Sequence, residues 1–209
     1  MGRPRKFSRE QLQDAALALV DARGLAGLSM RTLAAELGTG PMTIYNHVAN
    51  RADLDVLVVE AVVARADWPQ PRGVDWREDV QCIATAMWRA VRAHPHAIPL
   101  ILTRRSRSPA ALAVAEALLD ALSRSGRSGQ RLLVAFRAVS ALVMGFAQAE
   151  LAGPLAVEAG EAAEAVIRRI RALPRQRYRR LIEIAGAAAR SNPEREFRAG
   201  LDLLLDGLA

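Results

Sequence analysis

The chain has 209 residues, 51% of them hydrophobic, and a formal net charge of +7 at pH 7. This length and apolar content support a full hydrophobic core and exclude a disordered chain. Lys6 is the only lysine among the 29 basic residues. Arginine suits bidentate contact with phosphate and guanine, but such an arginine bias more often reflects a GC-rich genome than a function. Cys82 is the only cysteine, so no intrachain disulfide or cysteine metal cluster is expected, and we expect this residue to lie in the core.

The first predicted helix runs from Ser8 to about Gly24. Ser8 and Gln11 have the spacing of a capping box, in which each side chain bonds the other residue's backbone N–H. Apolar residues then recur at helical spacing: Leu12, Ala15, Ala16, Leu19 and Val20.

Two short helices separated by a glycine-containing turn are predicted next. Ser29 is a favourable N-cap for the first, which should end at Gly38. Thr39 should cap the second, which has Pro41 near its start. The inner edge of this second helix is formed by Ile44 and Val48. Two helices joined in this way are typical of a helix-turn-helix, whose second helix enters the DNA major groove.

A fourth helix should begin at a cap formed by Asn50 and Asp53. It carries a continuous apolar stripe made of Leu54, Leu57, Val58, Ala61 and Val62. Prolines and a glycine then break the pattern over residues 68–73. We therefore expect a DNA-binding domain over residues 1–65, built on a three-helix helix-turn-helix, and a larger helical domain over residues 66–209.

The larger domain is predicted to contain helices only. The expected segments are 75–94, a short apolar piece at 97–103, 108–126, 128–151, 158–173, 174–190 and 193–208. No segment alternates with a period of two, so no strand is expected. The predicted fold class is all-α, with about nine or ten helices.

The most apolar stretch, residues 132–151, is long enough to cross a bilayer. It contains Arg137, Gln148 and Glu150, so we interpret it as a buried or interface helix and not as a membrane span. Because it is apolar on nearly every side, we expect it to pack against two partners. The basic start of the chain has no apolar run behind it and is not typical of a signal peptide. A cytoplasmic location without a membrane partner is expected.

Residues 38–51 resemble the recognition helix and the start of the following helix of the tetracycline-repressor (TetR) family. The resemblance is close over about the first 65 residues and weaker beyond them, where residues 197–208 look like the end of the tetracycline-type regulatory domain. The residues that carry it are Thr43-Ile44-Tyr45 and His47-Val48-Ala49-Asn50-Arg51. It implies a homodimeric regulator that binds double-stranded operator DNA and a small-molecule effector.

The resemblance also implies roles for individual residues at DNA. Thr43 matches a position facing the groove, and Tyr45 and His47 match positions that contact phosphate or support the helix. Asn46 offers the amide that reads adenine, and Arg31 could bind guanine. The complete predicted DNA-binding set is Arg3, Arg5, Lys6, Ser29, Arg31, Thr32, Thr39, Gly40, Pro41, Met42, Thr43, Tyr45, Asn46, His47 and Arg51.

Within this set, Arg51 is expected to hold a phosphate, and the first basic residues are expected to form an arm that attracts DNA. Pro41 and Met42 match base-proximal positions but can give only apolar contacts. Gly40 and Pro41 stand where tetracycline repressors have longer polar residues, so the operator sequence cannot be carried over.

An effector pocket is implied in the larger domain by the same resemblance. Its predicted lining combines apolar and a few polar side chains: Asp67, Ile83, Met87, Trp88, His96, Leu100, Thr103, Phe136, Ser140, Met144 and Gln148.

Three positions depart from the tetracycline repressors. Leu100 stands where a metal-binding histidine is found, Ile83 replaces a ligand-binding asparagine, and Asp67 replaces a drug-binding histidine. We therefore expect no magnesium–tetracycline site and a more apolar effector. His94 and His96 lack a third metal ligand at useful spacing, so no metal or other cofactor is expected.

The sequence contains no recognisable catalytic motif, so an enzyme is not expected. A second basic cluster within residues 168–180 is interpreted as a solvated surface and not as another nucleic-acid site. The favoured hypothesis is a repressor released from DNA by its ligand. The alternatives are an activator or a regulator without a small effector, and a helical ligand-binding or scaffolding protein without specific DNA recognition.

Overall fold

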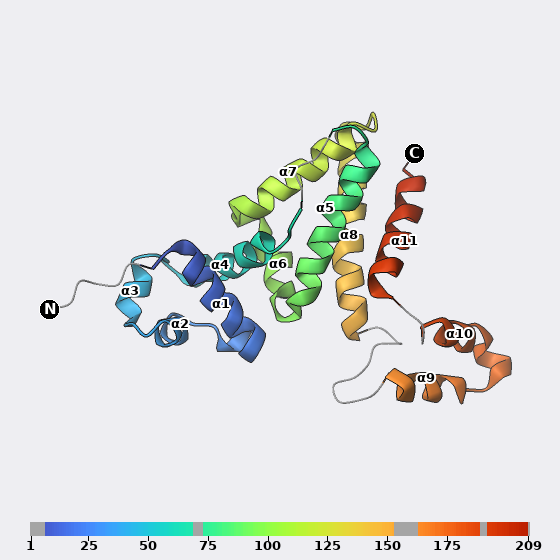
Figure 1. Cartoon of the computed structure of the whole chain (residues 1–209), viewed down its shortest axis with the longest axis horizontal. Coiled ribbons are helices and arrows are strands. Elements are labelled where there is room, and N and C mark those ends of the chain that lie inside the picture. The colour runs from blue at the N-terminus through green and yellow to red at the C-terminus, as the bar shows by residue number, and fades with distance from the viewer. Residues whose placement is uncertain (1–6, 69–72, 153–162, 189–191, 209) are drawn as a thin grey trace.

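The computed structural model describes residues 7–68, 73–152, 163–188 and 192–208, and Figure 1 shows the arrangement of its helices. Within these ranges the chain forms eleven α-helices, three short 3₁₀-helices and no strand, which confirms the predicted all-α class. The α-helices are α1 (Arg9–Arg23), α2 (Met30–Glu36), α3 (Pro41–Tyr45), α4 (Arg51–Ala64), α5 (Trp76–Ala93), α6 (Ile98–Arg104), α7 (Pro109–Ser123), α8 (Gly129–Ala152), α9 (Ala163–Arg171), α10 (Arg175–Ala188) and α11 (Pro193–Asp206).

The three 3₁₀-helices connect α-helices. They are η1 (Leu25–Gly27), η2 (Pro95–Ala97) and η3 (Arg105–Arg107). The expected count of nine or ten helices was too low because the short apolar piece after Pro95 folds as η2 followed by α6. Helices of three and seven residues are too short to show a helical period clearly in sequence.

The predicted helix caps are largely confirmed. The Ser8 hydroxyl accepts a hydrogen bond from the backbone N–H of Gln11, which closes the expected capping box of α1. Ser29 caps α2 and Asn50 caps α4 in the same manner. These caps satisfy N–H groups at the first turn that have no partner within the helix.

The predicted cap of α3 was wrong. Gly40 occupies the N-cap position and makes no side-chain bond, while the hydroxyl of Thr39 donates to the hydroxyl of Thr43 at 3.0 Å. The helix is also shorter than expected, because it ends at Tyr45 and Val48 lies beyond it. Val48 is nevertheless buried together with Ile44, as the spacing predicted.

The helix-turn-helix lies at one end of the molecule and the α9–α10 pair lies at the other (Figure 1). Between them, α5, α7, α8 and α11 pack together, and α4 contacts both α1 and the neighbouring helices α6 and α7. Trp88 of α5 stacks on Phe197 of α11, with ring centroids 4.9 Å apart, and both side chains are buried. This contact anchors the last helix to the larger domain.

Helix α8 packs against α5, α7 and α11, which agrees with the interpretation of this stretch as a helix with more than one partner. By length and composition its segment Gly129–Ala149 could cross a membrane, and 28% of the most apolar window is buried. Several of its other apolar side chains are exposed, among them Leu133 and Val134.

Cys82 was wrongly predicted to lie in the core. It is exposed on α5, whereas the next residue, Ile83, is buried. Neighbouring positions on a helix point about 100° apart, so an apolar segment alone does not determine which of its residues face solvent.

Candidate DNA-binding surface and effector cavity

Helix α3 presents a row of exposed side chains on a buried support. Ile44 is fully buried beneath the helix, while 74% of Met42 and 49% of Tyr45 are exposed. Asn46 and His47 follow in the turn after α3 and are also exposed. The predicted base-proximal and phosphate-proximal groups therefore lie together at the surface.

The turn between α2 and α3 fixes the relative position of these helices. Gly38 has φ +63°, a conformation that side-chain-bearing residues adopt rarely. Beyond it, the backbone N–H of Thr39 donates to the carbonyl of Ala34 at 2.8 Å. Thr43 is half-buried, and its hydroxyl accepts a hydrogen bond from the hydroxyl of Thr39.

At the start of α2, two hydroxyls are engaged within the protein and one arginine is exposed. The hydroxyl of Thr32 donates to the carbonyl of Gly27 at 2.8 Å and accepts from the backbone N–H of Ser29, also at 2.8 Å. The hydroxyls of Ser29 and Thr32 are thus engaged in the cap. Arg31 is exposed and forms no ion pair with any residue that the structure describes.

Arg51, the expected phosphate ligand, points back into the protein. Its Nε donates to Oδ1 of Asp55 at 2.8 Å, and its Nη atoms donate to the carbonyls of Leu28 and Leu25. The other oxygen of Asp55 accepts from Nε of Arg104 at 3.4 Å. Arg51 therefore ties the loop before α2 to the start of α4, and these contacts were not foreseen from the sequence.

The predicted basic arm of Arg3, Arg5 and Lys6 lies outside the described residues.

A largely apolar cavity of about 340 Å³ lies where α4 meets helices that follow it in the chain. Its wall is built from α4, α5, α6, η3, α7 and α8, and it includes two valines of α4. The lining residues are Val59, Val63, Ile83, Ala84, Met87, Val91, Ile101, Arg105, Ser106, Ala111, Leu112, Val114, Ala115, Leu118, Leu119, Phe136, Ser140, Val143 and Met144. Its size and apolar lining suit a small organic molecule.

Two separate stretches of the chain match known protein families. Residues 12–54 match the family of bacterial regulatory proteins named tetR, and residues 68–209 match the tetracyclin repressor-like C-terminal domain. The chain belongs to the TetR family. The expectation drawn from residues 38–51 is thereby confirmed.

Among relatives of this TetR-family chain is an HTH-type transcriptional regulator of Saccharopolyspora erythraea, 34% identical over 71% of this chain and 66% of that protein. The transcriptional repressor DrrR1 of Streptomyces coeruleorubidus is 31% identical over 68% of this chain and 53% of its own length. The chain thus spans between about half and two thirds of these two relatives.

Solved structures of the family resemble the whole fold. Apo ActR from Streptomyces coelicolor superposes with a TM-score of 0.78 at 27% identity, covering 99% of this chain and 96% of that chain. ActR in complex with actinorhodin gives 0.76 at 27% identity, covering 98% and 97%. BioQ bound to its double-stranded DNA operator gives 0.65 at 25% identity, covering 98% and 99%.

The predicted effector residues of this TetR-family chain fall into two groups. Five of them line the cavity: Ile83, Met87, Phe136, Ser140 and Met144. The other six do not, namely Asp67, Trp88, His96, Leu100, Thr103 and Gln148.

These six residues lie in several different environments. Trp88 is buried against Phe197, and its Nε1 has no hydrogen-bond partner in the described structure. Leu100 is buried outside the cavity, and Asp67 is exposed at a separate polar groove beside α5 and α11. The remaining three, His96, Thr103 and Gln148, are exposed.

Two of those exposed polar groups are engaged elsewhere. Nδ1 of His96 lies 3.1 Å from the carbonyl of Asp21, and Nδ1 of the neighbouring His94 lies 2.8 Å from the Asp21 carboxylate. The hydroxyl of Thr103 donates to the carbonyl of Pro99 at 2.8 Å. The two histidines thus join the end of α5 to α1, and the described residues contain no group of three potential metal ligands.

Sequence reasoning missed the contribution of α4, η3 and α7 to the cavity. Val59 and Val63 line the cavity but lie outside the apolar stripe predicted for this helix, and Leu112 of α7 lines it with 52% of the residue exposed. Only the crossing of α4 and α7 over α5 and α8 places these residues around one space, and no local signal in the sequence contains that information.

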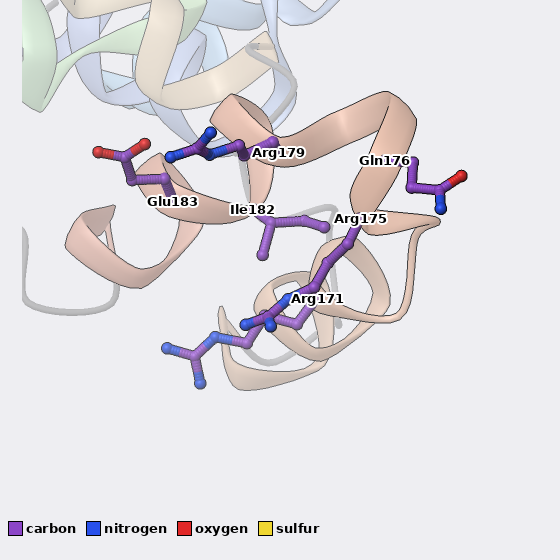
Figure 2. Close-up of a pocket in the computed structure, with 6 residues that line it drawn as sticks. All are labelled: Arg171, Arg175, Gln176, Arg179, Ile182 and Glu183. Carbon is purple, nitrogen blue, oxygen red and sulfur yellow. The ribbon is translucent and has the colours of Figure 1, made fainter.

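The second basic cluster lies on α9 and α10, where all of its arginines are exposed. Figure 2 shows Arg171, Arg175 and Arg179 around Ile182, at a groove that Glu183 also lines. The two helices pack on each other through a small separate apolar cluster centred on Val166, Ile170 and Ala185. This geometry fits the interpretation as a solvated surface, and we assign it no function.

Proposed function

We propose that this chain is a homodimeric transcriptional repressor that binds a pseudo-palindromic operator and is released by a small, largely apolar effector. The observation that carries the proposal is that one helix serves both sites. Helix α4 begins at Arg51, which holds the helix-turn-helix loop, and its Val59 and Val63 line the cavity about two and three turns later. A ligand in the cavity therefore contacts the element that positions the DNA-reading surface.

At DNA, we assign base contacts to the exposed groups around α3 and to Arg31. Asn46 and Arg31 can form bidentate hydrogen bonds with adenine and guanine, and Met42 offers an apolar contact. Tyr45, His47 and the basic N-terminal arm supply phosphate contacts, together with the backbone of Gly40 and Pro41.

The buried or engaged members of the predicted set receive a different role. Ser29, Thr32, Thr39 and Thr43 use their hydroxyls within the helix-turn-helix, so we propose that they position α2 and α3. Arg51 has the same positioning role, and a phosphate could bind only those of its N–H groups that remain unused.

Dimerisation is assigned to the exposed apolar faces of α8 and α11. On these neighbouring helices, 54% of Val134 and 76% of Leu203 are exposed. Burial of such side chains against the same helices of a second copy would form a four-helix bundle. The dimer would present two α3 helices to successive major grooves, roughly 34–36 Å apart.

Release follows from linkage. Suppose that the effector binds more tightly to a form of the dimer in which the distance between the two α3 helices does not match the operator. Effector binding then lowers the affinity for the operator, and operator binding lowers the affinity for the effector by the same free energy.

We propose residues 1–65 as the DNA-binding unit and residues 66–209 as the sensing and dimerising unit. We propose no catalytic activity or cofactor, and a location in the cytoplasm. ActR, solved in complex with actinorhodin, and BioQ, solved with its operator, support both halves of this assignment.

Selection of purified protein on a random duplex library tests the proposal. We expect enrichment of a sequence with two-fold symmetry. Arg31→Ala should weaken binding of the enriched duplex by about tenfold or more. Arg179→Ala, which removes the same charge at the opposite end of the molecule, should leave it unchanged. Failure to enrich any sequence would favour a helical ligand-binding or scaffolding protein instead.

A further inference from the structure

Among the described residues that line the effector cavity, Arg105 carries the only charged side chain. None of these described lining residues is a carboxylate. The other polar side chains are the hydroxyls of Ser106 and Ser140, and every remaining lining side chain is apolar. The cavity therefore offers a cation and hydroxyls to a ligand, and nothing that would compensate a positive charge.

The charged group lies at the open end of the cavity, and the inner wall is apolar. Arg105, Ser106 and Leu112 are exposed, which places them at its open end, whereas Val59 and Ile83 are buried at its inner wall. A ligand entering here would meet the guanidinium group at the mouth and apolar surface further in.

Arg105 differs from the other two arginines of the same turn. Arg104 pairs with Asp55 at 3.4 Å, and Arg107 pairs with Asp53 at 3.1 Å. The side chain of Arg105 forms no hydrogen bond or ion pair with any residue in the described ranges. Its guanidinium remains available for a ligand.

The start of α7 adds to the positive potential at the mouth. This helix begins at Pro109, and its first-turn residues Ala111 and Leu112 belong to the cavity wall. The N-terminal end of a helix carries a partial positive charge, which favours an anion nearby. This contribution has the same sign as that of Arg105.

We infer that the effector is an organic acid: an apolar body with one carboxylate that binds Arg105 and Ser106 at the mouth. This inference rests on the proposed function of the cavity and names the class of its ligand. A guanidinium group binds a carboxylate through two parallel hydrogen bonds, which a neutral group cannot match. A ligand ammonium group would lose water without gaining a carboxylate partner.

Three probes with one shared apolar body test this inference. 2-Naphthoate, 2-naphthamide and 2-naphthylmethylamine carry an anionic, a neutral and a cationic group, and isothermal titration calorimetry near neutral pH compares their affinities. We expect 2-naphthoate to bind about tenfold or more tightly than the amide, and the amine to bind most weakly.

Matched variants then locate the preference. Arg105→Gln should weaken 2-naphthoate about tenfold and leave the amide unchanged. Arg107→Gln removes the same charge two residues away, at a side chain outside the cavity wall, and should leave both affinities unchanged. Ala115→Phe places a ring in the cavity and should weaken the acid and the amide alike.

The outcomes separate this inference from the proposed function. Equal binding of acid and amide, or an unchanged acid preference in Arg105→Gln, would overturn the inference while the cavity remains an effector site. If no probe binds, both the inference and the effector-binding part of the proposed function are overturned.

Discussion

Asp55 of α4 accepts hydrogen bonds from two arginines, one from each part of the molecule. Its Oδ1 lies 2.8 Å from Nε of Arg51 beside the helix-turn-helix, and its Oδ2 lies 3.4 Å from Nε of Arg104 at the end of α6. Only 4% of Asp55 is exposed. Arg104 is followed directly by Arg105 in the cavity wall, so this carboxylate joins the cavity to the loop that supports α2.

Replacing this carboxylate should destabilise the protein. In Asp55→Asn both arginines lose a charged partner, and hydrogen bonds to charged groups contribute about 1.5–3 kcal/mol. Because both guanidinium groups remain partly hydrated, we expect a loss of about 1–3 kcal/mol in the free energy of unfolding, measured by urea denaturation. Asp53→Asn, which breaks the more exposed pair with Arg107, should cost less than about 1 kcal/mol. Equal losses in the two variants would contradict the bridging role of Asp55.

The aromatic contact between α5 and α11 should be a major source of stability. Phe197 is fully buried, stacks on Trp88 and meets Phe146 edge-on at 5.6 Å between centroids. Phe197→Ala should therefore lower the free energy of unfolding by about 3–5 kcal/mol. Val74→Ala, at a side chain that is 91% exposed, should change it by less than about 0.5 kcal/mol. A loss below 1 kcal/mol for Phe197→Ala would show that α11 is not anchored here.

The proposed dimer interface can be tested by placing a charge on it. Leu203→Glu puts a carboxylate on the exposed face of α11, and its burial against a second copy would be unfavourable. We expect sedimentation velocity to show monomers at concentrations where the unmodified protein is dimeric, with helicity retained. Leu102→Glu adds the same charge at an exposed leucine of α6 and should leave the dimer intact. Dimers that survive Leu203→Glu would place the interface on another surface.

The ion pair between α5 and α11 should make stability depend on acidity. Arg89 donates to both carboxylate oxygens of Glu194, and these hydrogen bonds hold the Glu194 pKa below its ordinary value of 4.5. A lowered pKa in the folded state stabilises the protein above the unfolded-state pKa, and this contribution disappears as pH falls through the folded-state value.

Glu194→Gln should therefore unfold at lower urea concentration than the unmodified protein near neutral pH, and the difference should shrink as pH falls below about 4.5. Glu116→Gln, at an exposed glutamate of α7, provides a control for loss of one negative charge. A difference that is constant from neutral to acid pH would mean that the Arg89 pair does not contribute to folding.

The fold could be predicted from the sequence wherever local chemistry determines it. Ser8, Ser29 and Asn50 cap helices because each side chain reaches a backbone N–H three residues away, and that distance is visible in the sequence. Thr39 has the same chemistry but bonds Thr43 instead, since Gly40 provides the extended residue before α3. A local rule identifies candidates for a cap and does not choose between neighbours.

The site could be predicted only in part. The exposed groups around α3 follow from helical spacing and from the family resemblance. The engagement of Arg51 does not, because its partners Leu25, Leu28 and Asp55 come from separate segments. The same reason explains Trp88, whose helical position suits a cavity but whose ring is covered by Phe197.

The most direct test of the proposed function is fluorescence anisotropy of the enriched duplex, titrated with protein over a range of salt concentrations. We predict two protomers per duplex. The logarithm of the association constant should fall linearly with the logarithm of salt concentration, since several phosphates are neutralised on binding. We also predict at least about 10³-fold weaker binding of a scrambled duplex. Equal affinity for the enriched and scrambled duplexes would contradict sequence-specific recognition by α3, and with it the assignment as an operator-binding repressor.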